Sequence, residues 1–275
     1  MTGIDRIEET FKRLARESRS AFMPFLAAGD PDMDTTVRLI CAMEKSGADL
    51  LELGVPYSDP LADGAIIQDS FTRALASGVR VADVIDSIRR ARSAGAGLPV
   101  LTMVSYSLVY RYGPERYVND LVRAGADGLI VPDLTVEEAD SLLGLTARAG
   151  LALVFLVTPT TPAQRERRIL DHTTGFVYCV SVVGITGERT SLPDTLTGQV
   201  RRLRSHTGLP ICVGFGVSGP EQASRVAALA DGVIVGSALV RCISELPPDR
   251  VVAGASEFAS SLARAVHETP ARRNA

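Results

Sequence analysis

Residues 47–54 read Gly-Ala-Asp-Leu-Leu-Glu-Leu-Gly, a glycine that can end a helix followed by an apolar run. The pattern recurs as Gly-Ala-Asp at residues 125–127, before the apolar residues 128–131, and as Ala-Asp-Gly at residues 230–232. Glycine favours the left-handed conformation that closes a helix, and an unbroken apolar run is typical of a strand covered on both faces. The recurrence therefore predicts repeated helix–strand units around a parallel sheet.

Eight apolar runs of strand length occur along the chain, over residues 21–27, 50–53, 100–104, 128–131, 152–157, 176–180, 210–213 and 233–235. Helical periodicity is found over residues 4–18, 35–46, 81–94, 114–124, 136–149, 162–171, 196–206 and 220–229. Eight alternations in about 250 residues match a single (β/α)8 TIM barrel with an extra N-terminal helix. We expect one domain over residues 1–268 and a disordered tail over residues 269–275.

A doubly wound sheet is the rival architecture, because it also alternates strands and helices. It usually has fewer strands, and the turn after the first strand here lacks the Gly-x-Gly-x-x-Gly pattern of a dinucleotide site.

Composition narrows the class of function. The 275 residues are 46% hydrophobic with a net charge of −3, and no basic arm is present, which argues against nucleic-acid or anionic-membrane binding. Neither a signal pattern nor an apolar run of about 20 residues occurs, so we expect a cytoplasmic enzyme acting on a small molecule. Four scattered cysteines indicate reduced thiols, and no metal site is expected.

Acidic residues gather where the second strand ends. Glu52 lies within the apolar run itself, where an ionised and unpaired carboxylate is costly, and Asp59 and Asp63 follow in the loop. Acids beyond the carboxyl end of a barrel strand predict a catalytic site. The alternatives are a structural ion pair between Glu52 and an arginine, and a cap by Asp63 for a helix that begins near Ala65.

Two glycine-rich segments predict a phosphate site. Gly-Phe-Gly-Val-Ser at residues 214–218 follows the seventh strand, and Gly-Ser-Ala at residues 236–238 follows the eighth. Barrels often bind phosphate with these two loops, because bare backbones bring several N–H groups and a helix N-terminus to one anion. Gly187, after the sixth strand, is a further possible donor, and the alternative is that these glycines only form tight turns.

These motifs together make the chain resemble the tryptophan synthase alpha chain family, from about residue 22 to residue 238. The resemblance is densest at residues 51–64, Leu-Glu-Leu-Gly-Val-Pro-Tyr-Ser-Asp-Pro-Leu-Ala-Asp-Gly, and continues at residues 178–187. It implies retro-aldol cleavage of indole-3-glycerol phosphate to indole and glyceraldehyde 3-phosphate, without a metal or cofactor. It also implies a pyridoxal-phosphate β chain as partner, in an α2β2 heterotetramer that receives the indole.

The resemblance assigns a role to each expected site residue. Glu52 is the general acid/base at indole C3 and the glycerol hydroxyl, and Asp63 holds the indole N–H. The remaining substrate-binding residues are Phe25, Leu101, Tyr178 and Thr186, and the phosphate-binding residues are Gly187, Gly216, Gly236 and Ser237. The reaction itself needs two carboxylates in different environments, so we expect burial to raise the pKa of Glu52 and a polar loop to keep Asp63 ionised.

Some positions depart from the family pattern, namely Tyr57, Ala65, Thr135 and residues 105–108. They lie on loops that resemble the family's contact surface for the β chain, which leaves a stand-alone lyase releasing free indole as an alternative. A non-catalytic activator of a β chain and another sugar-phosphate barrel enzyme are further alternatives. Intact Glu52 and Asp63 argue against the activator.

Overall fold

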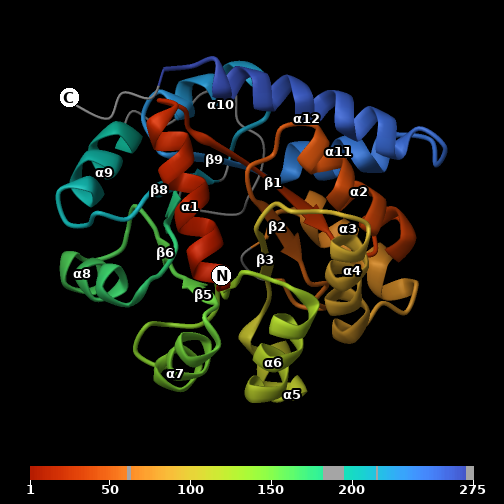
Figure 1. The fold of residues 1–275 in the computed structure, drawn as a ribbon, viewed down its shortest axis with the longest axis horizontal. Coiled ribbons are helices and arrows are strands. Elements are labelled where there is room, and N and C mark those ends of the chain that lie inside the picture. The colour runs from red at the N-terminus through yellow and green to blue at the C-terminus, as the bar shows by residue number, and fades with distance from the viewer. Residues whose placement is uncertain (61–62, 182–194, 215, 271–275) are drawn as a thin grey trace.

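A computed structural model describes residues 1–60, 63–181, 195–214 and 216–270 of the chain. A parallel barrel is ringed by helices (Figure 1), which confirms the predicted (β/α)8 TIM barrel and its N-terminal helix. The strands are β1 Ala21–Ala27, β2 Leu51–Gly54, β3 Val100–Met103, β4 Gly128–Ile130, β5 Ala152–Val154, β6 Leu156–Val157, β7 Val177–Val180, β8 Ile211–Gly214 and β9 Gly232–Val235. Their order in the sheet is β5-β4-β3-β2-β1-β9-β8-β7-β6.

The fifth predicted strand, residues 152–157, is interrupted at Phe155 and forms β5 and β6. The Phe155 N–H donates to Thr173 Oγ1 at 3.0 Å, a side chain from the turn before β7, instead of to a neighbouring strand. β5 pairs with β4, and β6 pairs with β7. The two ends of the strand order are therefore one residue apart in the chain, and the barrel closes at this point.

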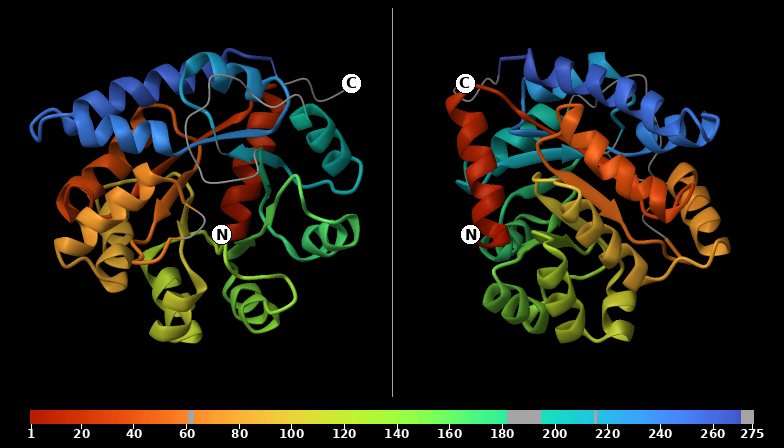
Figure 2. Two further views of the ribbon diagram at one scale, coloured as in Figure 1. Left: turned by 180° about the vertical axis from the view of Figure 1, so that it is seen from behind. Right: turned by 45° about the vertical axis from the view of Figure 1, so that its right-hand side comes forward.

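The helices surround the barrel on its outer face (Figure 2). They are α1 Gly3–Arg16, α2 Met33–Lys45, α3 Ala65–Ala76, α4 Val81–Ser93, α5 Tyr106–Tyr112, α6 Pro114–Ala124, α7 Asp140–Ala149, α8 Ala163–His172, α9 Thr195–Arg204, α10 Pro220–Ala227, α11 Ser237–Glu245 and α12 Val251–His267. The helical periodicity did not predict α3, α5, α11 or α12, although a helix that begins near Ala65 was one explanation of Asp63. Helix α12 packs against α2, α10 and α11. It therefore holds together helices from the beginning and the end of the barrel.

Helix α1 covers the amino ends of the strands (Figure 1). Its buried residues Ile7, Phe11 and Leu14 form one face and pack against the side chains inside the barrel. The ring centroids of Phe11 and Phe176 are 6.0 Å apart, and the Ile4 N–H donates to the Gly150 carbonyl at 3.0 Å. The amphipathic helix thus closes one end of the barrel and leaves the other end open to a site.

The aspartates of the repeated turn pattern each hold a neighbouring strand at this closed end. Their carboxylates accept backbone N–H groups: Asp49 from Phe22 at 3.0 Å, Asp127 from Val100 at 2.7 Å, and Asp231 from Ile211 at 3.0 Å. They also form ion pairs: Asp49 with Arg13 and His267, Asp127 with Arg6 and Arg92, and Asp231 with Arg204. His267 is largely buried at this contact, with a side chain 15% exposed.

We propose that residues 1–268 are one domain, because β1 pairs with β9 and α12 packs against α2. Residues 271–275, most of the expected tail, lie outside the described residues. Within the described ranges, no helix has both the length and the apolar character that a membrane crossing requires.

Candidate active site

Glu52 lies in the middle of β2 with its side chain inside the barrel. The residue is 1% exposed, and neither carboxylate oxygen has a hydrogen-bond partner in the part of the chain that the structure describes. Burial raises the pKa of this carboxyl well above its ordinary value, and the negative charge of Asp63 raises it further. Burial therefore favours the neutral form of Glu52, which is the form that can give a proton.

Asp63 lies directly before α3, whose N-cap is Gly64. The sequence placed Asp63 on a polar loop, but burial raises the pKa of its carboxyl to about 6. The group is still mostly ionised at neutral pH. Burial raises the pKa of both acids, but only Glu52 is shifted further by a neighbouring charge, so the two carboxyls lie in the different environments that acid–base chemistry between them requires.

Phe25 and Leu101 flank Glu52 on the two neighbouring strands. Phe25 on β1 and Leu101 on β3 are its register partners, so the three side chains lie at one level of the barrel. Both apolar residues are buried, and a methyl group at Gly54 would collide with the Phe25 ring. A second ring, Phe71 of α3, lies 6.5 Å from Phe25 between centroids, and these residues form an apolar wall next to the acid.

Tyr178 approaches the acids from β7 and is 3% exposed. Burial raises the pKa of its hydroxyl well above the ordinary value, and the charges of Glu52 and Asp63 act in the same direction. A Cβ atom at Gly214 would lie 2.5 Å from the Tyr178 hydroxyl oxygen. The glycine on β8 therefore makes the space that the tyrosine occupies, and the hydroxyl stays protonated as a donor.

The described phosphate-loop residues adjoin this wall. Gly216 has a φ of +83°, a left-handed conformation that favours glycine. Gly236 is the N-cap of α11, and Ser237 is the first residue of that helix. Because a Cβ at Gly236 would lie 3.7 Å from Phe25, the positive end of α11 and the apolar wall share one site.

A cavity of about 200 Å³ opens beside Asp63. Its lining includes Tyr57 and Pro60 after β2, Ser105 after β3, and Asp133 after β4. Asp133 accepts hydrogen bonds from Ser105 Oγ at 2.7 Å and from the Tyr106 N–H at 2.8 Å. Asp133 thus accepts the N–H of the first residue of α5 and supports this loop, apart from Glu52 and Asp63.

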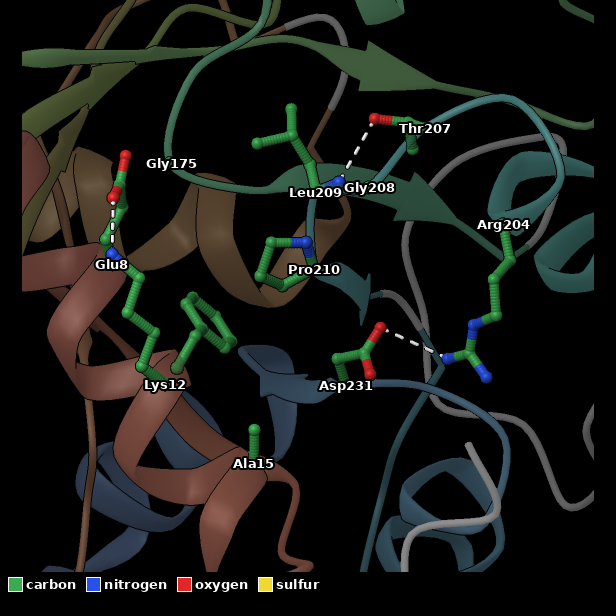
Figure 3. Close-up of a pocket in the computed structure, with 11 residues that line it drawn as sticks. Glu8, Lys12, Ala15, Gly175, Arg204, Thr207, Gly208, Leu209, Pro210 and Asp231 are labelled. Atoms are coloured by element: carbon green, nitrogen blue, oxygen red, sulfur yellow. Dashed lines mark hydrogen bonds and ion pairs between the residues drawn. The ribbon is translucent and has the colours of Figure 1, made fainter. Parts of the chain in front are cut away.

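A larger cavity of about 480 Å³ lies between α1 and the segment before β8 (Figure 3). Its charged groups are already paired: Lys12 with Glu8 at 2.9 Å, and Arg204 with Asp231 at 3.1 Å. The cavity is at the amino ends of the strands, whereas TIM-barrel active sites lie at the carboxyl ends. In the described residues, no three His, Cys, Asp or Glu side chains gather as a metal site would require.

Comparison with known proteins identifies the family. A family profile described as "Tryptophan synthase alpha chain" matches residues 11–267. The chain belongs to the tryptophan synthase alpha chain family. Curated alpha chains from Rhodopirellula baltica and Geotalea uraniireducens are 49% and 46% identical to it, over 87% and 94% of this chain and 87% and 97% of theirs.

Solved structures of tryptophan synthase share the fold. A Mycobacterium tuberculosis tryptophan synthase structure superposes with a TM-score of 0.88 at 35% identity, and covers 95% of this chain and 98% of its own. The tryptophan synthase alpha subunit of Legionella pneumophila gives 0.88 at 37% identity with the same coverage. Family membership confirms the predicted enzyme class, a carbon–carbon lyase.

The alpha-chain site is only partly covered by the described residues. Thr186 and Gly187, expected to bind substrate and phosphate, lie outside them. The eight other expected residues are Glu52, Asp63, Phe25, Leu101, Tyr178, Gly216, Gly236 and Ser237. Sequence reasoning missed Phe71, Gln68 and the role of Gly214, because their contacts join segments distant in the chain or depend on a turn's geometry. The apolar spacing of α3 was the only available signal for Phe71.

Proposed function

We propose that Glu52 and Asp63 catalyse the cleavage of indole-3-glycerol phosphate to indole and glyceraldehyde 3-phosphate. One observation carries the proposal: a fully buried carboxyl without a hydrogen-bond partner in the described residues lies within the electrostatic reach of a second, ionised carboxylate. An acid whose neutral form is favoured, beside an acid that is mostly ionised at neutral pH, suits a reaction that adds one proton and removes another.

The proposed reaction begins with proton transfer from neutral Glu52 to C3 of the indole ring, which leaves a positive charge on the ring nitrogen. The Asp63 carboxylate accepts a hydrogen bond from the ring N–H and offsets that charge. The Glu52 carboxylate then takes the proton of the hydroxyl on the carbon attached to C3. The bond between C3 and that carbon breaks, its electron pair returns to the ring, and indole and the aldehyde are formed.

The surrounding residues bind the substrate in this proposal. Phe25 and Leu101 contact the indole ring, and the Tyr178 hydroxyl donates toward the glycerol oxygens. The backbone N–H groups of Gly216, Gly236 and Ser237, joined by Gly187, bind the phosphate, which the positive end of α11 favours. Thr186 closes the loop after β7 over the substrate by a hydrogen bond to Asp63, and water is excluded while the bond breaks.

We propose a β chain as the partner that receives the indole, in an α2β2 heterotetramer in which pyridoxal phosphate belongs to the β chain. The cavity beside Asp63 supports this, because it opens among the loops after β2, β3 and β4 and offers a way out for indole. A stand-alone lyase is the second candidate, since Tyr57 and Ser105, two departures from the family pattern, line this cavity. A cytoplasmic location is supported by the free thiols of all four cysteines.

Indole release from indole-3-glycerol phosphate by the purified chain tests the proposal, first alone and then with a tryptophan synthase β chain. Replacing Glu52 with Gln or Asp63 with Asn is expected to lower kcat by about 10²–10⁴-fold, because each step loses its acid or its charge. Asp69→Asn is the matched control, since Asp69 is an exposed acid on α3, the helix that follows Asp63, and the activity of this variant should stay within about twofold.

The outcomes separate the candidates. Acceleration by the β chain, with loss in both variants, supports the alpha-chain proposal in full. Fast release of indole at a rate that does not change when the β chain is added identifies a stand-alone lyase. Full activity in Glu52→Gln would refute the assigned acid.

A further inference from the structure

The side-chain amide of Gln68 links the backbone carbonyls of Pro60 and Asp63. Gln68, on the first turns of α3, donates from its Nε2 to the Asp63 carbonyl at 2.7 Å and to the Pro60 carbonyl at 3.3 Å. The Asp63 N–H donates to the same Pro60 carbonyl at 3.1 Å. Both backbone polar groups of Asp63 are therefore held, one of them directly by Gln68.

The helix that carries Gln68 is itself firmly anchored. Arg73, five residues further along α3, donates two hydrogen bonds to Asp30, at 2.9 and 2.7 Å. Asp30 is 4% exposed and lies after β1, and Phe71 packs against Phe25 of that strand. Gln68 thus fixes the backbone of Asp63 relative to an anchored helix. It acts through backbone carbonyls and not on the reacting atoms.

We infer that Gln68 is a positioning residue for the cleavage reaction, which holds the backbone of Asp63 so that its carboxylate stays in the buried place beside Glu52. The inference rests on the proposed function for the role of Asp63, but the placement of the carboxylate can be measured without substrate. The glutamine amide suits the task because one nitrogen carries two N–H donors and can reach two carbonyl oxygens.

The ionisation of Asp63 reports its placement. Its pKa of about 6 comes from burial, so a carboxyl released toward solvent returns toward the ordinary value of 3.8. The titratable groups around it are Glu52 on β2, Tyr178 on β7, and Asp59 and Asp133 across the shared cavity. A substitution of Gln68 replaces none of these four titratable residues. The midpoint of the Asp63 titration therefore reports how the Asp63 carboxylate is placed.

The test is a carboxyl ¹³C NMR titration of the full chain labelled at aspartate, with the Asp63 signal assigned by its absence in Asp63→Asn. Gln68→Met keeps the length of the side chain and removes the donors, and Gln68→Asn keeps the amide but shortens its reach. Thr72→Val is the control, because Thr72 donates an exposed hydrogen bond to the backbone carbonyl of Gln68, and its loss leaves the Gln68 side-chain amide in place. We expect the midpoint to fall by about one pH unit or more in both Gln68 variants and to stay unchanged in the control.

Kinetics supply the second measurement. In Gln68→Met we expect kcat to fall about tenfold while KM and the melting temperature change little, because a displaced carboxylate weakens stabilisation of the transition state more than substrate binding. A midpoint within about 0.3 units of wild type in both Gln68 variants would overturn the inference. If the wild-type chain released no indole, the proposed function would fail, and the titration would still decide where Gln68 places Asp63.

Discussion

At the carboxyl ends of the strands, Glu52 is buried with no hydrogen-bond partner in the described residues, whereas at the amino ends Asp127 is buried and fully engaged. Burial raises the pKa of both carboxyls. The Val100 N–H, Arg6 and Arg92 lower the pKa of Asp127 and so oppose the effect of burial. The negative charge of Asp63 instead raises the pKa of Glu52 further. The same side-chain chemistry therefore serves stability at one end and reactivity at the other.

The two ends of the barrel differ in whether the free-energy cost of burying a carboxylate is compensated. A buried carboxylate is destabilising unless hydrogen bonds and opposite charges compensate, and the three aspartates of the closed end have both. The open end leaves that cost uncompensated, as is common where a group must change its protonation state during catalysis. Substitutions at the two ends should accordingly change stability in opposite directions.

Asp127→Ala should give the largest change in stability. It leaves Arg6 and Arg92 without their shared partner and removes the acceptor of the Val100 N–H, so we expect a loss of about 3–5 kcal/mol in urea denaturation. The rate of indole release per folded molecule should be unchanged. Glu221→Ala is the control, because Glu221 forms only an exposed i,i+4 pair with Arg225 among the described residues and should cost less than about 1 kcal/mol. Equal losses of stability in the two variants would show that Asp127 stabilises the fold no more than an exposed ion pair does.

Asp63→Asn should have a smaller effect of the opposite sign that depends on pH. Because the folded pKa of about 6 exceeds the ordinary 3.8, Asp63 stabilises the fold only while protonated, and this stability is lost as pH rises from about 4 through 6. We expect the variant to gain about 1–2 kcal/mol over wild type at pH 8 and nothing near pH 4. Thermal melts across that range measure it, and parallel curves for the two proteins would contradict the buried placement.

Lys12→Ala should produce the smallest change. The pair of Lys12 with Glu8 lies on the rim of the large cavity, and both side chains are about half exposed. We expect a cost below about 0.5 kcal/mol and unchanged indole release. Thermal melting and the indole assay would check this. A large loss of activity would show that the closed end also contributes to catalysis.

Much of the barrel could be predicted from sequence because its signals are local. The strand at residues 128–131 follows a helix-closing glycine, and β4 begins at Gly128 as expected. The interruption at Phe155 could not be predicted, since it depends on a hydrogen bond from a turn eighteen residues away. Helix α12 follows the last strand, so the strand count gave no reason to expect it.

The candidate site divides in the same way. Glu52 is recognisable alone, because a carboxylate in an apolar run is unusual. Asp63 needed the family motif, since a helix cap explains it equally well from sequence. The glycine at position 214 shows its purpose only in space, where the Tyr178 hydroxyl occupies the volume of the missing side chain. Gln68 acts through backbone carbonyls, which no residue pattern reveals.

The docking of α1 has a consequence for the order of events during synthesis. This helix contacts Asp127, Gly150 and Phe176, all of which follow it by more than a hundred positions. A nascent chain must therefore carry the apolar face of α1 unburied until well over half of the barrel has left the ribosome. Early release or slow translation should make this segment a target for chaperones, because the strands that cover its apolar face are made after it.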